Sequence, residues 1–330
     1  MLIHLDPQSF SEEALLPAAK ILQSGGICAF PTETVYGLGA NAFNEKAVSK
    51  IFEAKGRPQD NPLIVHVSDT AQLKDICYVT MQAKQLIAKF WGGPLTLILP
   101  KTDRIPRTVT AGLDTVAVRM PSHPIANALI RLTGLPIAAP SANLSGKPSP
   151  TTAQDVITDM DGRCDMIIDG GNCLWGVEST VLDLTVSPPA ILRPGAVTKE
   201  MLSAEIGTVI YGTGVGAPKS PGMKYKHYAP QAPVLIVEAE DAVSAVSHHA
   251  ANYEKPGILC FGYAKEAFHL PIAIYAGDDE AQYAARLFYS LREFDRQGAD
   301  VIYAIPPHSG GIGDAVRNRL YKAAGGKTIQ

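Results

Sequence analysis

Short apolar runs alternate with segments of helical periodicity along roughly the first 200 residues, and this alternation restricts the fold more than any other feature. Residues 27–31, which follow Gly25-Gly26, and residues 63–67 have the length of buried strands. Between them, residues 45–54 carry apolar side chains at helical spacing, with Asn44 in the position of an N-cap. The pattern predicts an α/β fold. Because the order is not a regular βαβ repeat, we expect a large twisted mixed sheet. By the same criteria we expect strands at 95–99, 116–119, 137–139, 165–168 and 180–184, and helices at 81–91, 124–133 and 152–160.

Composition changes near residues 207–232, where Gly and Pro are concentrated, and such a segment is typical of a linker. Beyond it the pattern is shorter and more regular, which predicts a small open parallel sheet. We therefore expect one domain over residues 1–208, a linker over 209–232 and a second domain over 233–330, in keeping with the chain length of 330 residues. The second domain should contain strands at 234–238, 257–261, 272–275 and 300–304 and helices at 240–253 and 279–296.

Composition also limits the classes of function. The formal net charge is -3 at pH 7, which disfavours a protein that wraps nucleic acid, because phosphate binding needs clustered Lys and Arg. The five cysteines are scattered and form no CxxC pair, so we expect neither a zinc site nor a disulfide framework. The first residues lack the pattern of a signal peptide, and no apolar run approaches the ~20 residues of a membrane span. A cytoplasmic protein is expected.

The first polar motif, Pro31-Thr32-Glu33-Thr34-Val35-Tyr36-Gly37-Leu38-Gly39-Ala40, directly follows a predicted strand. Open α/β sheets bind ligands at such strand ends. Two hydroxyls, a carboxylate and a phenol lie within five residues, and Gly37 and Gly39 would let the backbone approach a ligand closely. A polar turn that binds nothing is the alternative, and the motif alone leaves both readings open.

The second motif is Lys55-Gly56-Arg57-Pro58, followed by Asn61. Gly56 and Pro58 should end the preceding helix. Two cations and an amide on a rigid loop suit a polyphosphate. The alternative is a solvated basic helix terminus that complements the helix dipole.

A third polar segment, residues 140–150, follows the strand expected near residues 136–139. Its hydroxyls and amides, among them Ser141, Asn143 and Ser149, suit a loop that holds a ligand. Ordinary turn chemistry is the alternative.

Single polar residues stand in or next to other strands. Arg119 ends an apolar strand, where an unpaired cation would be costly, so it should meet either a protein carboxylate or a substrate carboxylate. His66 lies within a strand, where a lone histidine is usually a satisfied core residue. Ser179 opens a further strand, and Arg193 follows the strand expected at 190–192.

Taken together, these segments resemble the YrdC-like family of threonylcarbamoyl-AMP synthases. The family signature Lys-x-Arg…Ser-x-Asn appears as Lys55, Arg57, Ser141 and Asn143. Residues 220–230, Ser-Pro-Gly-Met-Lys-Tyr-Lys-His-Tyr-Ala-Pro, are similar to the linker of its two-domain branch. In that branch a YrdC-like catalytic domain carries a smaller Rossmann-like C-terminal domain, and the linker folds over the active site. The matching stretches are Phe30–Asn41, Ala54–Val67, Trp91–Leu97, Ala111–Pro124, Pro136–Ser149, Asp169–Thr180 and Leu192–Val197.

The resemblance implies two neighbouring sites. The four signature residues would be catalytic, and Mg²⁺ would be held by ATP phosphates rather than by protein side chains. L-Threonine would be held by Thr34, His66, Arg119, the backbone at Ala139, and Ser179. ATP would be held by Arg57, Asn61, Thr115, Ser141, Ser149, Arg193 and, from the linker, Tyr228.

The implied activity is that of a nucleotidyltransferase, an L-threonylcarbamoyladenylate synthase. It would form threonylcarbamoyl-AMP and pyrophosphate from L-threonine, bicarbonate or CO2, and ATP. A downstream transferase complex would use the product to modify tRNA next to the anticodon, and we expect neither membrane association nor stable nucleic-acid binding. One alternative is a double-stranded RNA-binding factor in translation or ribosome maturation, which the negative charge disfavours. Carbamoyl transfer, as in the related domain of hydrogenase maturation proteins, is another; those chains carry zinc-finger and acylphosphatase-like segments that this sequence lacks.

Overall fold

The computed structural model describes residues 1–212 and 227–330, and these residues pack as two units. Unit 1 consists of Met1–Ser145, Pro150–Leu174 and residues 178–212. Unit 2 consists of Gly146–Ser149, Trp175–Val177 and residues 227–330. Two short segments that precede the linker in the chain therefore pack with the C-terminal residues.

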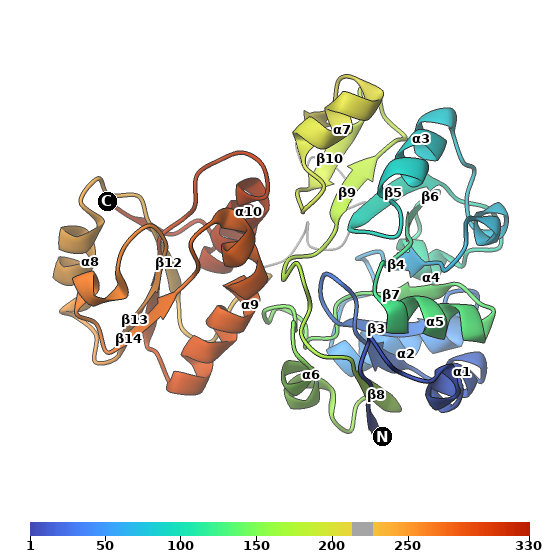
Figure 1. The fold of residues 1–330 in the computed structure, drawn as a ribbon, viewed down its shortest axis with the longest axis horizontal. Helices are drawn as coiled ribbons and strands as arrows, with labels where there is room; N and C mark the ends of the chain where they lie inside the picture. The colour runs from blue at the N-terminus through green and yellow to red at the C-terminus, as the bar shows by residue number, and fades with distance from the viewer. Residues whose placement is uncertain (213–226) are drawn as a thin grey trace. The chain divides into compact units, whose positions relative to one another are not determined.

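Unit 1 is built on a large mixed sheet, as predicted (Figure 1). Within the described residues it has the strand order β1-β8-β2-β3-β7-β4-β6-β5-β9-β10-β11. Parallel pairs such as β4 with β6 stand beside antiparallel pairs such as β5 with β6. The strands are β1 (Leu2–His4), β2 (Cys28–Phe30), β3 (Gly37–Asn41), β4 (Ile64–His66), β5 (Leu95–Pro100), β6 (Thr115–Arg119), β7 (Ile137–Ala139), β8 (Met166–Asp169), β9 (Thr180–Asp183), β10 (Ala190–Arg193) and β11 (Ile210–Tyr211).

The helices of unit 1 begin and end at residues that sequence rules identify. Asn44 caps the second helix, because its Oδ1 accepts a hydrogen bond from the Ala47 amide at 3.1 Å. Gly56 ends the same helix in the left-handed conformation, with φ of 61°. Both features were expected from the sequence. The helices are α1 (Leu16–Gln23), α2 (Glu45–Lys55), α3 (Met81–Phe90), α4 (Arg107–Thr110), α5 (Pro124–Thr133), α6 (Ala153–Met160) and α7 (Lys199–Ile206), with 3-10 helices at Glu12–Leu15 and Thr70–Asp75.

The two faces of this sheet differ, because successive side chains along a strand point to opposite sides. Val65, Val116 and Val118 join the large core on one face, which also receives apolar side chains of α2, α3 and α6. Ile64 and Ala117 belong to a smaller apolar cluster on the other face. His66 and Arg119 are two residues further along the same strands, so they share that second face with Ile64 and Ala117.

Unit 2 contains a five-stranded sheet among its described residues, and all its pairs are parallel, as predicted. In Figure 1, α8 lies on one side of this sheet and α9 and α10 on the other. The order is β14-β13-β15-β12-β16. The elements are β12 (Val234–Val237), α8 (Ala242–Ala250), β13 (Pro256–Cys260), β14 (Ile272–Tyr275), α9 (Glu280–Gln297), β15 (Val301–Ala304), α10 (Gly313–Ala324) and β16 (Thr328–Ile329), with a 3-10 helix at Lys265–Phe268.

The periodicity predicted most of these elements but not all. Helix α10 was missed because its buried face carries only two large apolar residues, Val316 and Leu320, among small residues and Arg319, which is fully buried. A charged residue at a core position breaks the apolar pattern on which the prediction depends. In unit 1, β1, β3, β11, α1, α4 and α7 were also missed, as was β16 in unit 2.

The two short segments of unit 2 are held by α9. Arg292 donates from Nε and Nη2 to the main-chain oxygen of Pro148 at 3.2 and 2.5 Å. The main-chain oxygen of Gly146 accepts a hydrogen bond from the Ala229 amide at 2.9 Å. Gly176 packs so closely on α9 that a Cβ built on it would lie 2.4 Å from the Ala284 oxygen.

Candidate active site

Three polar side chains lie at neighbouring positions of three adjacent strands in unit 1. His66 of β4 is directly opposite Arg119 of β6, and Thr96 of β5 is opposite Arg119 on its other side. Strand alternation puts all three on the same face of the sheet. The sequence predicted His66 and Arg119 as site residues; Thr96 was missed, although a hydroxyl inside the apolar run 95–99 was its signal.

Arg119 meets a protein carboxylate. Its Nη2 lies 2.6 Å from Glu33 Oε1, and both side chains are only 4% exposed. Its Nη1 donates to Thr34 Oγ1 at 2.9 Å. Burial alone would raise the pKa of Glu33, but the charge and hydrogen bond of Arg119 outweigh it and the pKa lies below its usual range. Of the two anions expected for Arg119, the structure therefore contains the protein one.

His66 is buried and neutral. Burial and the nearby charge of Arg119 lower its pKa to about 3. Its Nδ1 lies 3.1 Å from the main-chain oxygen of Ile64, and its ring meets Phe30 edge to face with centroids 6.2 Å apart. At neutral pH the imidazole can therefore donate or accept a hydrogen bond, but it does not carry charge.

Ser179 links the next two strands to this group. Its Oγ is 2.7 Å from Thr96 Oγ1 and accepts from Arg193 Nη2 at 3.1 Å. Arg193 Nε donates to the main-chain oxygen of Ser179 at 3.0 Å. Ser179 and Arg193, predicted in different subsites, are thus direct neighbours.

A second group forms where α2 ends. Lys55 is 2% exposed, and its ammonium group donates to the main-chain oxygens of Ser141 and Asn143. Ser141 Oγ donates to Asn143 Oδ1 at 2.5 Å. The sequence suggested that Lys55 contacts phosphates; in the structure it holds the loop that carries Ser141 and Asn143.

The loop after α2 is ordered by Arg57. Its Nη2 donates to the main-chain oxygens of Asn61 and Pro62, each at 3.3 Å. Asn61 is 1% exposed, and its Oδ1 has no hydrogen-bond partner among the described residues. Thr115 begins β6 and is half-buried.

Ala139 ends β7. It pairs with Ile64 of β4, whereas His66 pairs with Ile137. Two residues of a strand, about 7 Å, therefore separate the Ala139 and His66 positions along the sheet.

The two glycines of the first motif lie inside the sheet. Gly37 and Gly39 lie in β3, paired with β2. A Cβ on Gly39 would lie 2.6 Å from the ring of Phe30 and 2.6 Å from Ile137. The missing side chain at Gly39 makes room for Ile137 and for Phe30, the ring that packs on His66.

Ser149 and Tyr228 belong to unit 2 and are both buried. The Tyr228 ring lies 5.1 Å from that of Phe288, and the Arg319 guanidinium is 5.8 Å from its centroid. Most of the predicted lid, residues 213–226, lies outside the described residues.

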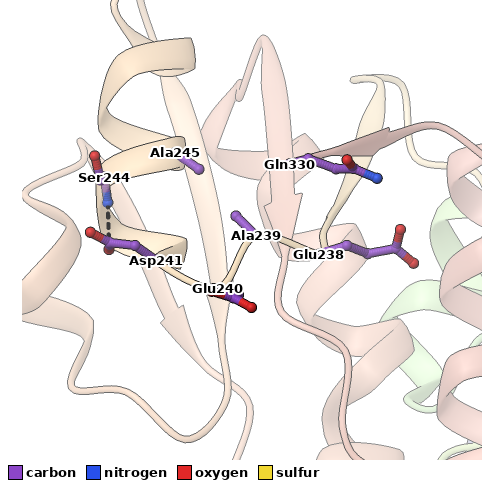
Figure 2. Close-up of a pocket in the computed structure, with 7 residues that line it drawn as sticks. All are labelled: Glu238, Ala239, Glu240, Asp241, Ser244, Ala245 and Gln330. Carbon is purple, nitrogen blue, oxygen red and sulfur yellow. Dashed lines mark hydrogen bonds between the residues drawn. The ribbon is translucent and has the colours of Figure 1, made fainter.

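Unit 2 also has a cavity that the sequence did not indicate (Figure 2). Its lining includes the carboxylates of Glu238, Glu240 and Asp241, and Asp241 Oδ1 accepts from the Ser244 amide at 3.0 Å to cap α8. A negatively charged lining is unsuited to a polyphosphate. In the described part of the chain, no group of three or more His, Cys, Asp or Glu side chains is arranged to hold a metal ion, and no helix is long and apolar enough to cross a membrane.

Comparison with known proteins places this geometry in context. A family described as "Telomere recombination" matches residues 20–195, and one described as "Threonylcarbamoyl-AMP synthase, C-terminal domain" matches residues 197–325. A threonylcarbamoyl-AMP synthase of Pyrococcus abyssi is 49% identical, with 95% of this chain and 94% of that protein aligned. A threonylcarbamoyl-AMP synthase of Bacillus subtilis is 48% identical, with 98% of this chain and 97% of that protein aligned. A crystal structure of P. abyssi Sua5 complexed with L-threonine matches this structure with a TM-score of 0.94 and 46% sequence identity. The match covers 99% of this chain and 98% of that chain.

Proposed function

Because this chain belongs to the threonylcarbamoyl-AMP synthase family, we propose that it joins L-threonine, bicarbonate or CO2, and ATP into threonylcarbamoyl-AMP and pyrophosphate. The observation that carries this proposal is the 49% identity to a synthase of that name over nearly the whole of both chains. The buried polar group around Arg119 supports it from the geometry.

We propose that threonine is bound by Thr34, His66, Arg119, the backbone at Ala139, and Ser179. Four of these residues lie close together: Arg119 contacts Thr34, stands opposite His66 in the sheet, and has Thr96, the neighbour of Ser179, on its other side. Such a set offers hydroxyl groups and a cation to a small polar amino acid with a hydroxyl group of its own.

We propose that ATP is bound by Arg57, Asn61, Thr115, Ser141, Ser149, Arg193 and Tyr228. We propose that Lys55 acts on the nucleotide through the loop that it holds, because the Ser141 and Asn143 oxygens occupy its ammonium group. Mg²⁺ is expected to arrive on the ATP phosphates, which is its usual mode in nucleotide enzymes.

In the proposed reaction the threonine amine becomes a carbamate, and a carbamate oxygen attacks the α-phosphorus of ATP while pyrophosphate leaves. This step needs no protein nucleophile. Holding two reactants in place can supply on the order of 7–11 kcal/mol of the barrier reduction. The guanidinium groups of Arg57 and Arg193 would stabilise the negative charge that develops on the phosphates.

We also propose that the domains divide at residues 208 and 233 and that the linker between them closes over the active site. Closure would protect the carbamate, which is labile in water. The product would pass to a downstream transferase complex that modifies tRNA in the cytoplasm.

Incubation of the protein with ATP, Mg²⁺, bicarbonate and labelled L-threonine tests the proposal. The expected product contains both threonine and AMP and appears together with one equivalent of pyrophosphate. A parallel incubation without bicarbonate should give none of it. Salt-sensitive binding of double-stranded RNA with no threonine-containing adenylate would contradict the proposal and favour the RNA-binding alternative.

A further inference from the structure

Glu33 and Arg119 form a buried ion pair that uses only part of the capacity of each group. Glu33 Oε1 lies 2.6 Å from Arg119 Nη2, and Arg119 Nη1 donates to Thr34 Oγ1 at 2.9 Å. Each side chain is only 4% exposed. The remaining polar atoms of the pair, Glu33 Oε2 and Arg119 Nε, are buried and make no hydrogen bond of normal geometry among the described residues; the main-chain N–H groups of Glu33 and Ser122 only face the carboxylate and help to lower its pKa.

These two atoms have opposite character. Oε2 is an acceptor with negative charge, and Nε is a donor with positive charge. A buried polar atom without a partner is costly, because it has lost water and gained nothing in exchange. A ligand that satisfied both atoms would need a cationic donor next to an anionic acceptor. A free α-amino acid at neutral pH is such a ligand, since its ammonium and carboxylate groups share one carbon atom.

The two histidines near the pair add no charge to it at neutral pH. His66 is neutral, with a pKa near 3. Burial also lowers the pKa of His123, against the opposing effect of the Glu33 charge, so this histidine too is predominantly neutral at pH 7. The charges of Glu33 and Arg119 cancel, and neither histidine adds to them. A zwitterion can enter such a site without bringing an uncompensated charge into the interior.

We infer that the Glu33–Arg119 pair is the receptor for both charges of the amino acid substrate, and that Glu33 Oε2 binds its α-ammonium group. The inference rests on the proposed function and assigns a role to a residue outside the threonine contacts named above. Glu33 thereby selects an α-amino acid over the corresponding α-hydroxy acid. The carbamate formed later keeps one N–H on the same nitrogen, which can still donate to Oε2.

The decisive measurement compares two ligands with the unmodified protein. L-Threonine and (2S,3R)-2,3-dihydroxybutanoate differ in one group, an ammonium replaced by a hydroxyl. Calorimetric titration should show the hydroxy acid binding at least about 30-fold more weakly, the value of a charge-assisted hydrogen bond. Equal affinities would overturn the inference, and this comparison depends on no variant being folded.

The variant Glu33→Gln gives the second test. Its affinity for L-threonine should fall by about 30-fold, while its affinity for the hydroxy acid changes much less, so the discrimination collapses. An unchanged ratio in a folded variant would contradict the role of Glu33. Glu12→Gln is the matched control, because Glu12 pairs with Arg131 at an exposed site, and it should keep the wild-type ratio.

These outcomes separate the inference from the proposed function. If wild-type protein makes the adenylate but Glu33→Gln keeps the wild-type discrimination, the inference fails and the function stands. If wild-type protein discriminates between the ligands but makes no adenylate, the function fails and the amino acid receptor stands.

Discussion

The ammonium group of Lys55 donates a hydrogen bond to the main-chain oxygen of Ser141 at 2.6 Å, although the two residues are 86 positions apart in the chain. The same group also donates to the main-chain oxygen of Asn143. One buried cation at the end of α2 thus fixes the loop that follows β7. The family signature Lys-x-Arg…Ser-x-Asn is in this respect a structural unit, since its first residue holds its last two.

The substitution Lys55→Met should release this loop. We expect adenylate formation to fall by about 100-fold, because a small displacement of groups that position a substrate has effects of that size. Two carbonyl groups lose their donor, which should cost about 1–3 kcal/mol of unfolding free energy. Lys50→Met is the matched control: Lys50 lies on the same helix and also donates to a carbonyl, that of Gly25 at 2.7 Å. Equal activities of the two variants would refute the positioning role.

Arg57→Ala should abolish threonine-dependent release of pyrophosphate without unfolding the protein. The guanidinium group donates two hydrogen bonds of 3.3 Å to main-chain oxygens, near the upper limit of length, and the loss of these two costs little stability. Its proposed contribution to catalysis is to stabilise the negative charge that develops on the phosphates. Pyrophosphate release and a thermal melt are measured on the same samples, with Arg131→Ala, which breaks an exposed ion pair, as the control. A wild-type rate would remove Arg57 from the mechanism.

Most strands and several helix boundaries followed from the sequence because local patterns determine them. The apolar run at 63–67 predicted β4, and Asn44 and Gly56 marked the two ends of α2, since capping depends on residues next to one another. Residue type alone also predicted that Arg119 must meet an anion.

Which partner each polar group meets could not be predicted in this way. Glu33 pairs with Arg119 across 86 positions, and this contact exists only because the loop after β2 lies beside the end of β6. Strand order is set by the packing of the whole sheet and leaves no local trace. The packing at Gly39 could not be predicted either. The space left by its missing side chain is filled by the ring of Phe30, which lies nine positions earlier in the chain.

Gly176→Ala should destabilise unit 2 more than the backbone conformation alone explains. Gly176 has φ of +66°, and a Cβ there would lie 2.4 Å from both the Ala284 oxygen and the Ala285 Cα of α9. Gly134 has the same φ of +66° with nothing within 4 Å, so Gly134→Ala measures the conformational cost by itself, about 1 kcal/mol. Gly176→Ala should cost at least about 2 kcal/mol more, because backbone must move. Calorimetric melts of both variants give the two changes in unfolding free energy. Equal changes would show that α9 moves to accommodate the Cβ at no further cost.

The buried state of His66 predicts a specific pH dependence of stability. Its pKa in the folded protein is about 3, because burial and the Arg119 charge oppose protonation, whereas an unfolded histidine has a pKa near 6.5. Between these values the unfolded chain binds a proton that the folded chain does not. The contribution of His66 is therefore fully present above pH 6.5 and decreases as the pH falls towards 3.

At pH 5 this loss should reach about 2 kcal/mol, relative to pH 7. The substitution His66→Gln removes the titrating group but keeps a neutral polar side chain, so the variant should lose about 2 kcal/mol less than wild type over the same interval, whatever its stability at pH 7. Denaturant titrations at pH 7, 6 and 5 give the two slopes. Because the carboxylates titrate equally in both proteins, they cancel in the difference. Parallel slopes would mean that His66 takes up a proton in the folded protein. The assignment of a neutral imidazole beside Arg119 would then be wrong.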